Sequence, residues 1–438
     1  MSMLQGLRVA AKFAAGMLGL LLALLLFWIG VNHFDRPLSA SARAILAAPP
    51  DPYSSDDNIY VALAGFDAPA GAVIGPVPPP RTLKFEGNIR WLQTPSVWTS
   101  AKGHGAQIAA LTGANRELYQ RYLSLHGLHG YFETGGTVDA VSGFLALVPL
   151  RPLFLANLAS EIQSGKPAEQ QAAVADLGQD LQLWKRVLDG TGGVFSKAMA
   201  AQALRVDLLL AGDMVTDPAC DLTFLRGEGD ALLAPFDAQS WKLGNAYEAD
   251  MRAGASSLAA LARAGGEGPW PQRADEWLGR QFFKLHATEN LEAQRTEELR
   301  ALADGNPATY RQRREAYDAA VRRSARISLA DFYDPVGKIT MAIAAAAAEE
   351  NLVPRVYDVA ALQRLVFLAY QVRRRGVPLA QLPQFMAQHP EWSTHPLGGK
   401  PFRWEPESGR LAVMPVEEEP MGQRFSLTLH ESHQVAGR

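Results

Sequence analysis

The chain has 438 residues, a formal net charge of −3 and 48% hydrophobic residues, so it is long enough to bury a large core. Its balanced charge supplies no basic field and argues against nucleic acid as a partner. Cys220 is the only cysteine, which excludes an intrachain disulfide. Any part of the chain exported to an oxidising compartment must therefore be stabilised by packing alone.

The first predicted element is an apolar segment from Phe13 to Val31, which holds 19 residues without a charge. As a helix it would be about 28 Å long, close to the thickness of the hydrocarbon core of a bilayer. It is longer than the apolar region of a secretory signal, and the small-residue triplet Ala40–Ala42 lies beyond several polar residues. We expect a retained membrane anchor, with cleavage as a signal peptide as the alternative.

The flanking charges predict the orientation of this anchor. Arg8 and Lys12 precede the apolar segment and Asp35 follows it. By the positive-inside rule, the N-terminus is expected in the cytoplasm and the rest of the chain on the other side. Arginine outnumbers lysine, alanine is abundant and there is no Asn-x-Ser/Thr acceptor, which together indicate a bacterial inner-membrane protein with a periplasmic body.

Small residues recur at every fourth position of the apolar segment. This spacing allows helix backbones to approach closely in lipid, so it predicts self-association or contact with another membrane protein. The alternative is that alanine and glycine are simply common in membrane helices. The candidate helix-packing face consists of Ala11, Ala15, Gly19 and Ala23.

Beyond the anchor the pattern predicts a mainly α fold. The expected organisation is a cytoplasmic N-terminus (1–12), a transmembrane helix (13–31), a juxtamembrane and proline-rich region with short strands (32–114), a helical region (115–270), a second helical region (271–394) and a β-hairpin tail (395–438). The break between the two helical regions is placed at Gly265–Pro271, where glycine and proline cluster.

Within the proline-rich region, residues 39–48 are expected to form a short helix. The apolar segment Asn58–Phe66 and the segment Thr82–Glu86 are interpreted as short strands, and the prolines of Asp67–Arg81 predict a loop. Apolar residues three or four positions apart then mark helices, as in Leu177, Leu181, Trp184 and Leu188.

Further along, residues 212–270 are less regular, and a long helix is expected from Arg273 to Asp304. Asn306 and Asp334 each precede a proline, which is the pattern of a helix start. Another helix is expected around Val359–Tyr370. In the tail, the alternation of Phe425, Leu427 and Leu429 with polar residues predicts a half-buried strand, so the tail is expected to form a small antiparallel β-sheet after two further short strands, Phe402–Trp404 and Leu411–Met414.

The segment His395–Trp404 (HPLGGKPFRW) resembles a segment with the pattern Asp-Pro-x-x-Gly-Lys-Pro-hydrophobic-Arg-aromatic in bacterial envelope proteins, a relative of which occurs near the C-terminal sheet of type II secretion pseudopilins. His395 stands where the pattern has aspartate, and the chain lacks the prepilin signature at its apolar helix. The resemblance therefore implies only a turn that feeds a β-hairpin. The layout as a whole resembles uncharacterised proteobacterial single-pass inner-membrane proteins.

An arginine cluster supplies the candidate contact for anionic groups. Acidic residues are few in this helical stretch, which favours contact with anionic lipid headgroups or an acidic partner; a solvated helix paired with acids elsewhere is the alternative. A second cluster covers Arg373–Arg375. The candidate residues are Arg311, Arg313, Arg314, Arg322, Arg323 and Arg326.

Local motifs for catalysis or metal binding are weak. His126 with His129, and His430 with His433, lack the third ligand and rigid backbone that a metal needs. The glycine-rich turn at Gly190–Gly193 precedes a helix but lacks the Lys-Ser/Thr of a phosphate loop, and Cys220 has no basic neighbour. No cofactor is therefore expected, and the tryptophans Trp91, Trp98, Trp270 and Trp277 are interpreted as core anchors rather than a glycan groove.

These observations lead to two hypotheses. The first is a non-enzymatic, membrane-anchored periplasmic protein for envelope assembly, secretion or partner binding, with the bilayer itself as one partner. The alternative is a membrane-tethered periplasmic hydrolase acting on lipid or glycan, because paired catalytic carboxylates leave no local mark in a sequence.

Overall fold

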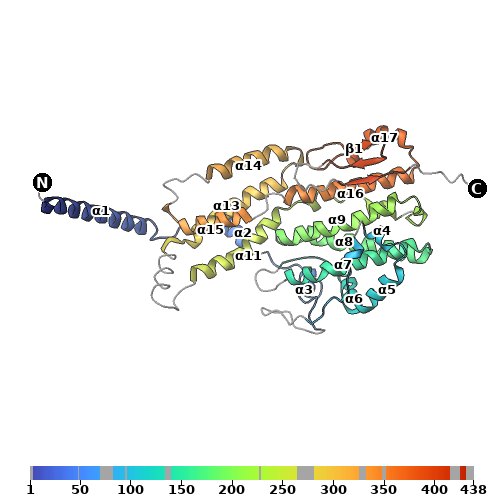
Figure 1. Cartoon of the computed structure of the whole chain (residues 1–438), viewed down its shortest axis with the longest axis horizontal. Coiled ribbons are helices and arrows are strands. Elements are labelled where there is room, and N and C mark those ends of the chain that lie inside the picture. The colour runs from blue at the N-terminus through green and yellow to red at the C-terminus, as the bar shows by residue number, and fades with distance from the viewer. Residues whose placement is uncertain are drawn as a thin grey trace, which may run out of the picture. The chain divides into compact units, whose positions relative to one another are not determined.

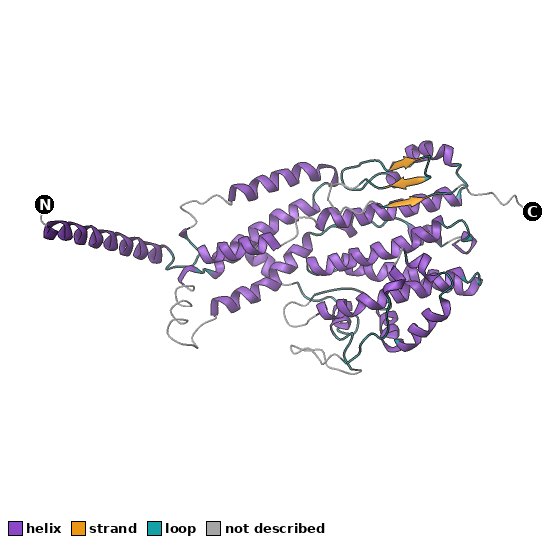
Figure 2. Ribbon diagram, in the orientation of Figure 1, coloured by secondary structure: helices purple, strands orange, loops and turns teal. Residues whose placement is uncertain are grey.

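The structure is a computed structural model of the chain (Figure 1). The chain forms two compact units. Unit 1 comprises Met1–Ala48, Met251–Leu299 and Arg314–Glu349, and unit 2 comprises Pro49–Asp250, Arg300–Arg313 and Glu350–Arg438. The structure describes residues 3–47, 49–69, 82–93, 96–133, 140–225, 228–263, 281–324, 332–347, 352–414 and 425–430. Figure 2 shows that most of these residues are helical and that a small sheet lies near the C-terminus.

Unit 1 is built from helices, and its described residues include a small hydrophobic core. Its elements are α1 (Met3–Val31), α2 (Ala40–Leu46), α15 (Pro335–Ala347) and the parts that fall within it of α11 (Gly244–Arg263), α13 (Leu285–Asp304) and α14 (Tyr310–Ser324). Ala42 and Ile45 of α2 pack against Met251 and Ala293. The predicted helix at residues 39–48 is thus confirmed as α2, and the Ser39 hydroxyl caps it by accepting a hydrogen bond from the Ala42 N–H at 3.0 Å.

The helix α1 differs from every other described helix in its exposure. Its apolar segment Ala11–Val31 has a mean hydropathy of 2.4 and none of its most apolar stretch is buried. Leu18 is 61% exposed and Leu26 is 67% exposed. Figure 1 shows this helix standing clear of the other helices of unit 1. The second apolar helix of sufficient length, Gly143–Gln163 of α7, is 61% buried and belongs to the core of unit 2.

Unit 2 is a helical body whose longest helices pack in sequence, α7 on α8, α8 on α9 and α9 on α16. Its helices are α3 (Ile59–Ala64), α4 (Val97–Ala101), α5 (Gly105–Ala114), α6 (Arg116–Leu125), α7 (Ala140–Gln163), α8 (Pro167–Asp189), α9 (Val194–Thr216), α10 (Gly229–Leu233), α16 (Leu352–Arg374), α17 (Leu382–Gln388) and α18 (Pro390–Ser393). Short 3₁₀ turns are η1 (Arg90–Gln93), η2 (Leu222–Leu225), η3 (Ala238–Trp241), η4 (Pro307–Thr309) and η6 (Leu379–Gln381).

The apolar stripes predicted from the sequence face this core. Leu177, Leu181, Trp184 and Leu188 of α8 are all buried, and α16 is buried along most of its length. The asparagine–proline start at Asn306 is confirmed, since the Asn306 carboxamide accepts a hydrogen bond from the Ala308 N–H at 3.0 Å. The helix expected around residues 359–370 is confirmed as part of α16.

The C-terminal sheet is antiparallel, with the order β1-β2-β3. Its strands are β1 (Arg403–Glu405), β2 (Arg410–Ala412) and β3 (Ser426–Thr428). Leu411 lies opposite Trp404 on one side and Leu427 on the other. Leu427 also packs on α9 at Gly212, where a Cβ atom would lie 2.9 Å from the Leu427 Cδ2. The predicted tail sheet is therefore confirmed, and the glycine lets the strand approach the helix.

The two strands expected in the proline-rich region are wrong. Residues 59–64 form the helix α3, because the Asn58 carboxamide caps it by accepting the Tyr60 N–H at 2.9 Å. The segment Thr82–Glu86 has no regular secondary structure and pairs with no strand in the described part of the chain; its Glu86 N–H donates to the Asn115 carboxamide at 2.8 Å instead. Most of the predicted loop at residues 67–81 lies outside the described residues.

Two further expectations need correction. Within the less regular region 212–270, residues 244–263 form the regular helix α11. The long helix expected from Arg273 is interrupted at Phe283–Lys284, and α13 starts afresh at Leu285 because carboxylates from other segments cap its first backbone N–H groups. The predicted boundary at residues 265–271 lies outside the described residues.

Candidate functional site

The most elaborate polar arrangement in unit 1 lies at the end of α1, and we call it the exit junction. Its first part fixes the last turn of α1 to residue 332. The Trp28 indole N–H and the Asn32 carboxamide both donate to the Phe332 carbonyl oxygen, each at 2.7 Å. The Trp28 ring also packs on Phe282, with ring centroids 4.5 Å apart. The end of the apolar helix is thus bound by two polar contacts and an aromatic one.

Asp334 is the centre of the junction. Its carboxylate accepts the N–H groups of Lys284 at 2.8 Å and Gly337 at 3.2 Å, and the Thr288 hydroxyl at 2.9 Å. Its own N–H donates to the Asn32 Oδ1 at 2.8 Å. One aspartate therefore caps the start of α15 and meets the start of α13 while its backbone holds α1.

The backbone and environment of Asp334 reflect these demands. It is the one non-glycine residue with a positive φ in the described part of the chain, at 53°, a conformation that aspartate tolerates better than most residues. It is 2% exposed, and burial raises the pKa of its carboxyl against the opposing effect of its hydrogen bonds.

The connection that follows α1 is joined along the start of α13. Asp35 accepts the backbone N–H groups of His286 at 2.8 Å and Ala287 at 3.1 Å. Asn290 donates to the Pro37 carbonyl at 3.0 Å and accepts the Ser39 N–H at 2.6 Å. Since a helix N-terminus carries partial positive charge, the two carboxylates of the junction are well placed there. The exit junction can hold α1 in a fixed direction relative to the rest of unit 1.

The candidate helix-packing face lies on the exposed part of α1. Ala11, Ala15, Gly19 and Ala23 are all exposed, and a Cβ atom added at Gly19 would meet no atom within 4 Å. The face is free of packing within the described chain, so contact with a partner through it stays a prediction.

The structure distributes the candidate anionic-contact arginines over different environments. Arg313 donates to the backbone carbonyls of Leu302 and Asn306, and Arg314 pairs with Asp318 at 2.9 Å. Arg311 and Arg322 are exposed. The side chain of Arg323 and all of Arg326 lie outside the described part. In the second cluster, Arg373 donates to the backbone carbonyls of Val215 and Asp217, and Arg374 pairs with Asp230.

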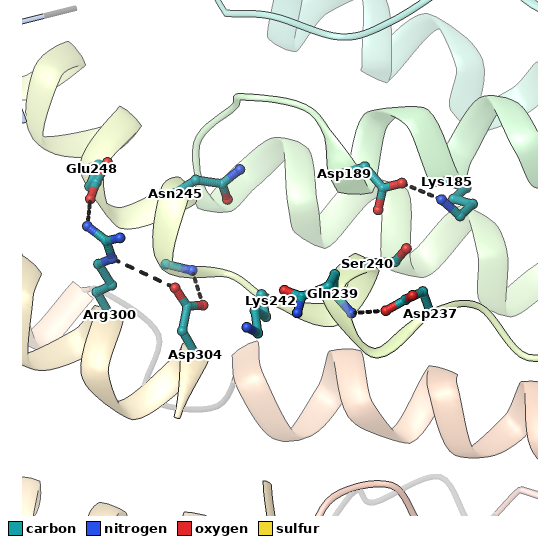
Figure 3. A pocket seen from close by; sticks show the side chains of 11 residues that line it. Lys185, Asp189, Asp237, Gln239, Ser240, Lys242, Asn245, Glu248, Arg300 and Asp304 are labelled. Carbon is teal, nitrogen blue, oxygen red and sulfur yellow. Dashed lines mark hydrogen bonds and ion pairs between the residues drawn. The ribbon is translucent and has the colours of Figure 1, made fainter. Parts of the chain in front are cut away.

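A polar cleft of about 500 Å³ opens in unit 2. Figure 3 shows that it is bordered at one end by Arg300, which pairs with Glu248 at 2.5 Å and approaches Asp304 at 3.8 Å, and at the other by the pair Lys185–Asp189. Asp304 also accepts the Gly244 N–H at 2.9 Å and so caps the start of α11. The remaining lining residues are Asp237, Gln239, Ser240, Lys242 and Asn245. Carboxylates and ammonium groups alternate on its wall, which suits a small polar ligand and supplies groups able to transfer protons.

A second set of charges is enclosed within the helices of unit 2. The Arg151 guanidinium bridges Asp180, at 3.0 Å, and Asp207. Tyr122 donates to Asp180 at 2.6 Å, and the His126 ring contacts the same carboxylate at 3.1 Å. Both aspartates are 0% exposed. Pairing with Arg151 allows these carboxylates to be buried, although the Asp207 Oδ2 has no hydrogen-bond partner in the described part of the chain.

This environment shifts the pKa values of the two aspartates in opposite directions. Burial raises the pKa of Asp207 well above its ordinary range, despite the nearby Arg151. Burial acts on Asp180 in the same sense, but Arg151 and His126 outweigh it and hold the pKa of Asp180 below its ordinary range. This is a facing pair of carboxylates with separated pKa values, yet solvent does not reach it.

The structure shows the surroundings of the histidine and cysteine motifs that the sequence offers as weak candidates. His126 contacts Asp180, whereas His129 is exposed and contacts Asp57 at 2.9 Å, so the two histidines do not converge. Across the residues that the structure describes, no group of three potential metal ligands occurs. Burial raises the pKa of the Cys220 thiol to about 11, so the thiol stays protonated. His433 lies outside the described residues.

The glycine-rich turn before α9 is occupied by the chain's own carboxylates. Glu133 accepts the Gly193 N–H, and Asp250 accepts the Val194 N–H at 3.2 Å. The anion seat at this helix start is thus filled from within. Trp98 is 4% exposed and donates to Asp217 at 2.8 Å, as expected of a core anchor, and Trp91 donates to the Asn88 carbonyl at 3.0 Å. Trp270 and Trp277 lie outside the described residues.

The exit junction was not foreseen from the sequence. Asp334 before Pro335 indicates only a helix start, and Asn32 is simply the first residue after the apolar segment Phe13–Val31. The available signal is a polar residue directly after a predicted membrane helix. The neighbouring sequence does not indicate which residues this polar residue contacts. Comparison with protein-family models, with curated proteins and with solved structures found no match to this chain.

Proposed function

We propose that the chain is a single-pass membrane protein of the bacterial inner membrane, with a cytoplasmic N-terminus and a periplasmic body that acts by binding a partner. The observation that carries the proposal is the exposure of the apolar segment Ala11–Val31 of α1, in which only Trp28 and Ile29 are partly buried. An apolar surface of this size is unfavourable in water and is the length that lipid requires.

The exit junction supports a role that depends on anchoring. A flexible tether would need no more than a polar linker after α1. Instead, Trp28 and Asn32 bind the Phe332 carbonyl, and Asp35 caps α13. A rigid joint of this kind holds unit 1 in one orientation at the membrane, which favours presentation of a binding surface to an envelope partner.

The hydrolase is the second candidate, and the polar cleft favours it. The cleft contains the carboxylates of Asp189, Asp237, Glu248 and Asp304 within about 500 Å³. Against it stands the enclosure of the aspartate pair with shifted pKa values: Asp180 and Asp207 are 0% exposed and cannot meet a substrate without local opening. The binding role therefore has the stronger support.

The anchor is tested by alkaline carbonate extraction and by C-terminal reporters. We expect the intact polypeptide to stay in the membrane pellet, a fused alkaline phosphatase to be active and a fused green fluorescent protein to be dark. The control replaces Leu21 and Leu22 by lysine, which should release the chain because charges at the centre of a span oppose insertion. Release of the unmodified, full-length chain, or a fluorescent reporter, would contradict the proposal.

Turnover separates the two candidate functions. The purified chain in detergent is supplied with phospholipid and with cell-wall glycan, beside variants Asp237→Asn and Glu248→Gln. Turnover that disappears in either variant would establish the hydrolase, and its absence together with specific crosslinking to an envelope protein would favour the binder.

A further inference from the structure

The segment that meets the end of α1 is arranged with its polar groups inward and its rings outward. We propose that Phe332, together with Phe34, forms a second membrane contact that lies in the lipid interface beside α1. The ligand is the lipid bilayer, contacted at the boundary between its headgroups and its acyl chains. This inference rests on the proposed anchoring of α1, and it adds that unit 1 itself touches the bilayer.

The depth of residue 332 follows from its contacts with α1. The segment Ala11–Val31 is about 31 Å long as a helix, which matches a hydrocarbon core of about 30 Å. Trp28 therefore lies within about 5 Å of the boundary. Because its indole N–H is 2.7 Å from the Phe332 carbonyl oxygen, residue 332 is held at almost the same depth. Residues more than 300 positions apart are thus brought to one level of the membrane.

The polar atoms at this level are satisfied from within the protein. The Phe332 carbonyl accepts two hydrogen bonds, from Trp28 and Asn32, and the Asn32 Oδ1 accepts the Asp334 N–H. Asn32 is 0% exposed. Pairing of this kind suits a backbone that lies against lipid, where water is not available as a partner.

The apolar groups at this level face outward. Phe332 is 46% exposed, Phe34 is 76% exposed and Phe27 on the last turns of α1 is 66% exposed. A single exposed phenylalanine is ordinary on a soluble protein. Three exposed apolar rings at the end of one apolar helix are instead suited to the headgroup–acyl boundary, and they lie beside Trp28 and Tyr333, the residue types enriched at membrane interfaces.

The adjacent charges suit a headgroup layer. Arg36 is exposed and lies over the Tyr333 ring, 4.6 Å from its centroid, and the Tyr333 hydroxyl donates to the Phe34 carbonyl at 3.3 Å. The carboxylate of Asp35, the residue before Arg36, is instead bound at the start of α13. A guanidinium next to exposed rings is thus available to lipid phosphates, while the neighbouring carboxylate is engaged by backbone N–H groups.

The test measures the depth of single labelled cysteines in the full-length chain. In a Cys220→Ala background, Phe332→Cys, Phe34→Cys, Phe27→Cys and Glu407→Cys are labelled with an environment-sensitive fluorophore and reconstituted in phosphatidylcholine vesicles. Glu407, exposed in the β1–β2 turn, is the aqueous reference, and Phe27 is the membrane reference. We expect labels at residues 332 and 34 to be quenched by lipid-borne nitroxide as at residue 27, and to be protected from aqueous iodide several-fold relative to residue 407.

The outcomes separate this inference from the anchor. If residue 27 is protected but residues 332 and 34 are quenched by iodide as strongly as residue 407, the second contact is wrong and the anchor stands. If residue 27 also reads as aqueous, the proposed function fails with it. Phe34→Cys replaces a ring that is 76% exposed, so it reports depth even where Phe332→Cys disturbs the junction, and a melting temperature equal to the parent's verifies its fold.

Discussion

The side-chain oxygen of Asn32 accepts a hydrogen bond from the backbone N–H of Asp334 at 2.8 Å, although the two residues lie 302 positions apart in the chain. The same carboxamide donates to the Phe332 carbonyl. The Asn32 side chain therefore forms hydrogen bonds with both a donor and an acceptor of the backbone at residues 332–334. This pair connects the end of the apolar helix to the start of α15.

We expect Asn32→Leu to destabilise unit 1 by about 1–3 kcal/mol, because the buried Asp334 N–H would lose its acceptor and the leucine cannot replace it. Hydrogen exchange of the α13 and α15 amides in detergent micelles measures the loss. The control is His33→Ala, which changes the next residue, an exposed one. Equal protection in the two variants would show that the contact does not support the junction.

The buried pair of Asp180 and Asp207 predicts that the free energy of unfolding depends on pH, and the substitution Asp207→Asn should remove the part due to Asp207. Because the pKa of Asp207 is raised in the folded state, the protein favours its protonated form. This contribution to stability is fully present below the unfolded pKa, about 4, and is lost as pH rises through the higher folded value. Asp207→Asn imitates the protonated carboxyl, so we expect its unfolding free energy to fall less steeply than that of the parent above pH 4.

Urea unfolding over a series of pH values measures this difference, with Glu117→Gln on the surface of α6 as the control. Asp180 should act in the opposite range. Its folded pKa is lowered, so its contribution is present above the unfolded pKa and is lost as pH falls through the folded value. A parallel pH profile for Asp207→Asn and the parent would contradict the assignment.

Lys197 provides a further pH test within unit 2. Its ammonium is 0% exposed and donates to the carbonyls of Val187 at 3.3 Å, Leu188 at 2.5 Å and Gly190, which end α8. Burial lowers the pKa of Lys197 to about 7. Between this value and the unfolded pKa of about 10.4, the unfolded chain binds more protons, so the stability contributed by Lys197 rises with pH.

We expect Lys197→Met to lose this rise and to be less stable by about 1–3 kcal/mol at neutral pH, because the buried carbonyls lose their donor. Thermal unfolding between pH 7 and pH 9 measures both effects. Lys166→Met is the matched control, because the Lys166 side chain is 70% exposed. A lysine variant whose stability keeps the parental slope would exclude Lys197 as the titrating group.

Elements that depend on neighbouring residues could be predicted from the sequence, whereas contacts between remote residues could not. The apolar helix α1 follows from an uninterrupted apolar run, and the buried stripe of α8 and the alternation in β3 follow from periodicity; these are local properties, and the three elements are confirmed. The interruption before Leu285 depends on Asp35 and Asp334, which reach α13 from remote segments. The exit junction could not be predicted from the sequence for the same reason, because Asn32 contributes to it through a contact with Asp334, 302 positions away.

The misassigned segment 58–66 leads to a last prediction. Asn58 is 0% exposed; its Nδ2 donates to the Phe132 carbonyl at 2.8 Å, and its Oδ1 accepts the N–H groups of Tyr60 at 2.9 Å and Phe132 at 3.1 Å. These bonds end the extended conformation and start α3. An apolar hexapeptide alone cannot distinguish a strand from this short buried helix.

We expect Asn58→Ala to cost more than about 2 kcal/mol, since it removes a helix cap and leaves two buried backbone groups of Phe132 without partners. Urea unfolding followed by tryptophan fluorescence measures the loss. Asn88→Ala is the matched control: Asn88 is exposed, and its carboxamide likewise accepts the N–H group two residues on, that of Arg90 at 3.0 Å. The control should cost less than about 1 kcal/mol. Equal costs would mean that the long-range bonds of Asn58 to Phe132 contribute nothing beyond a local turn.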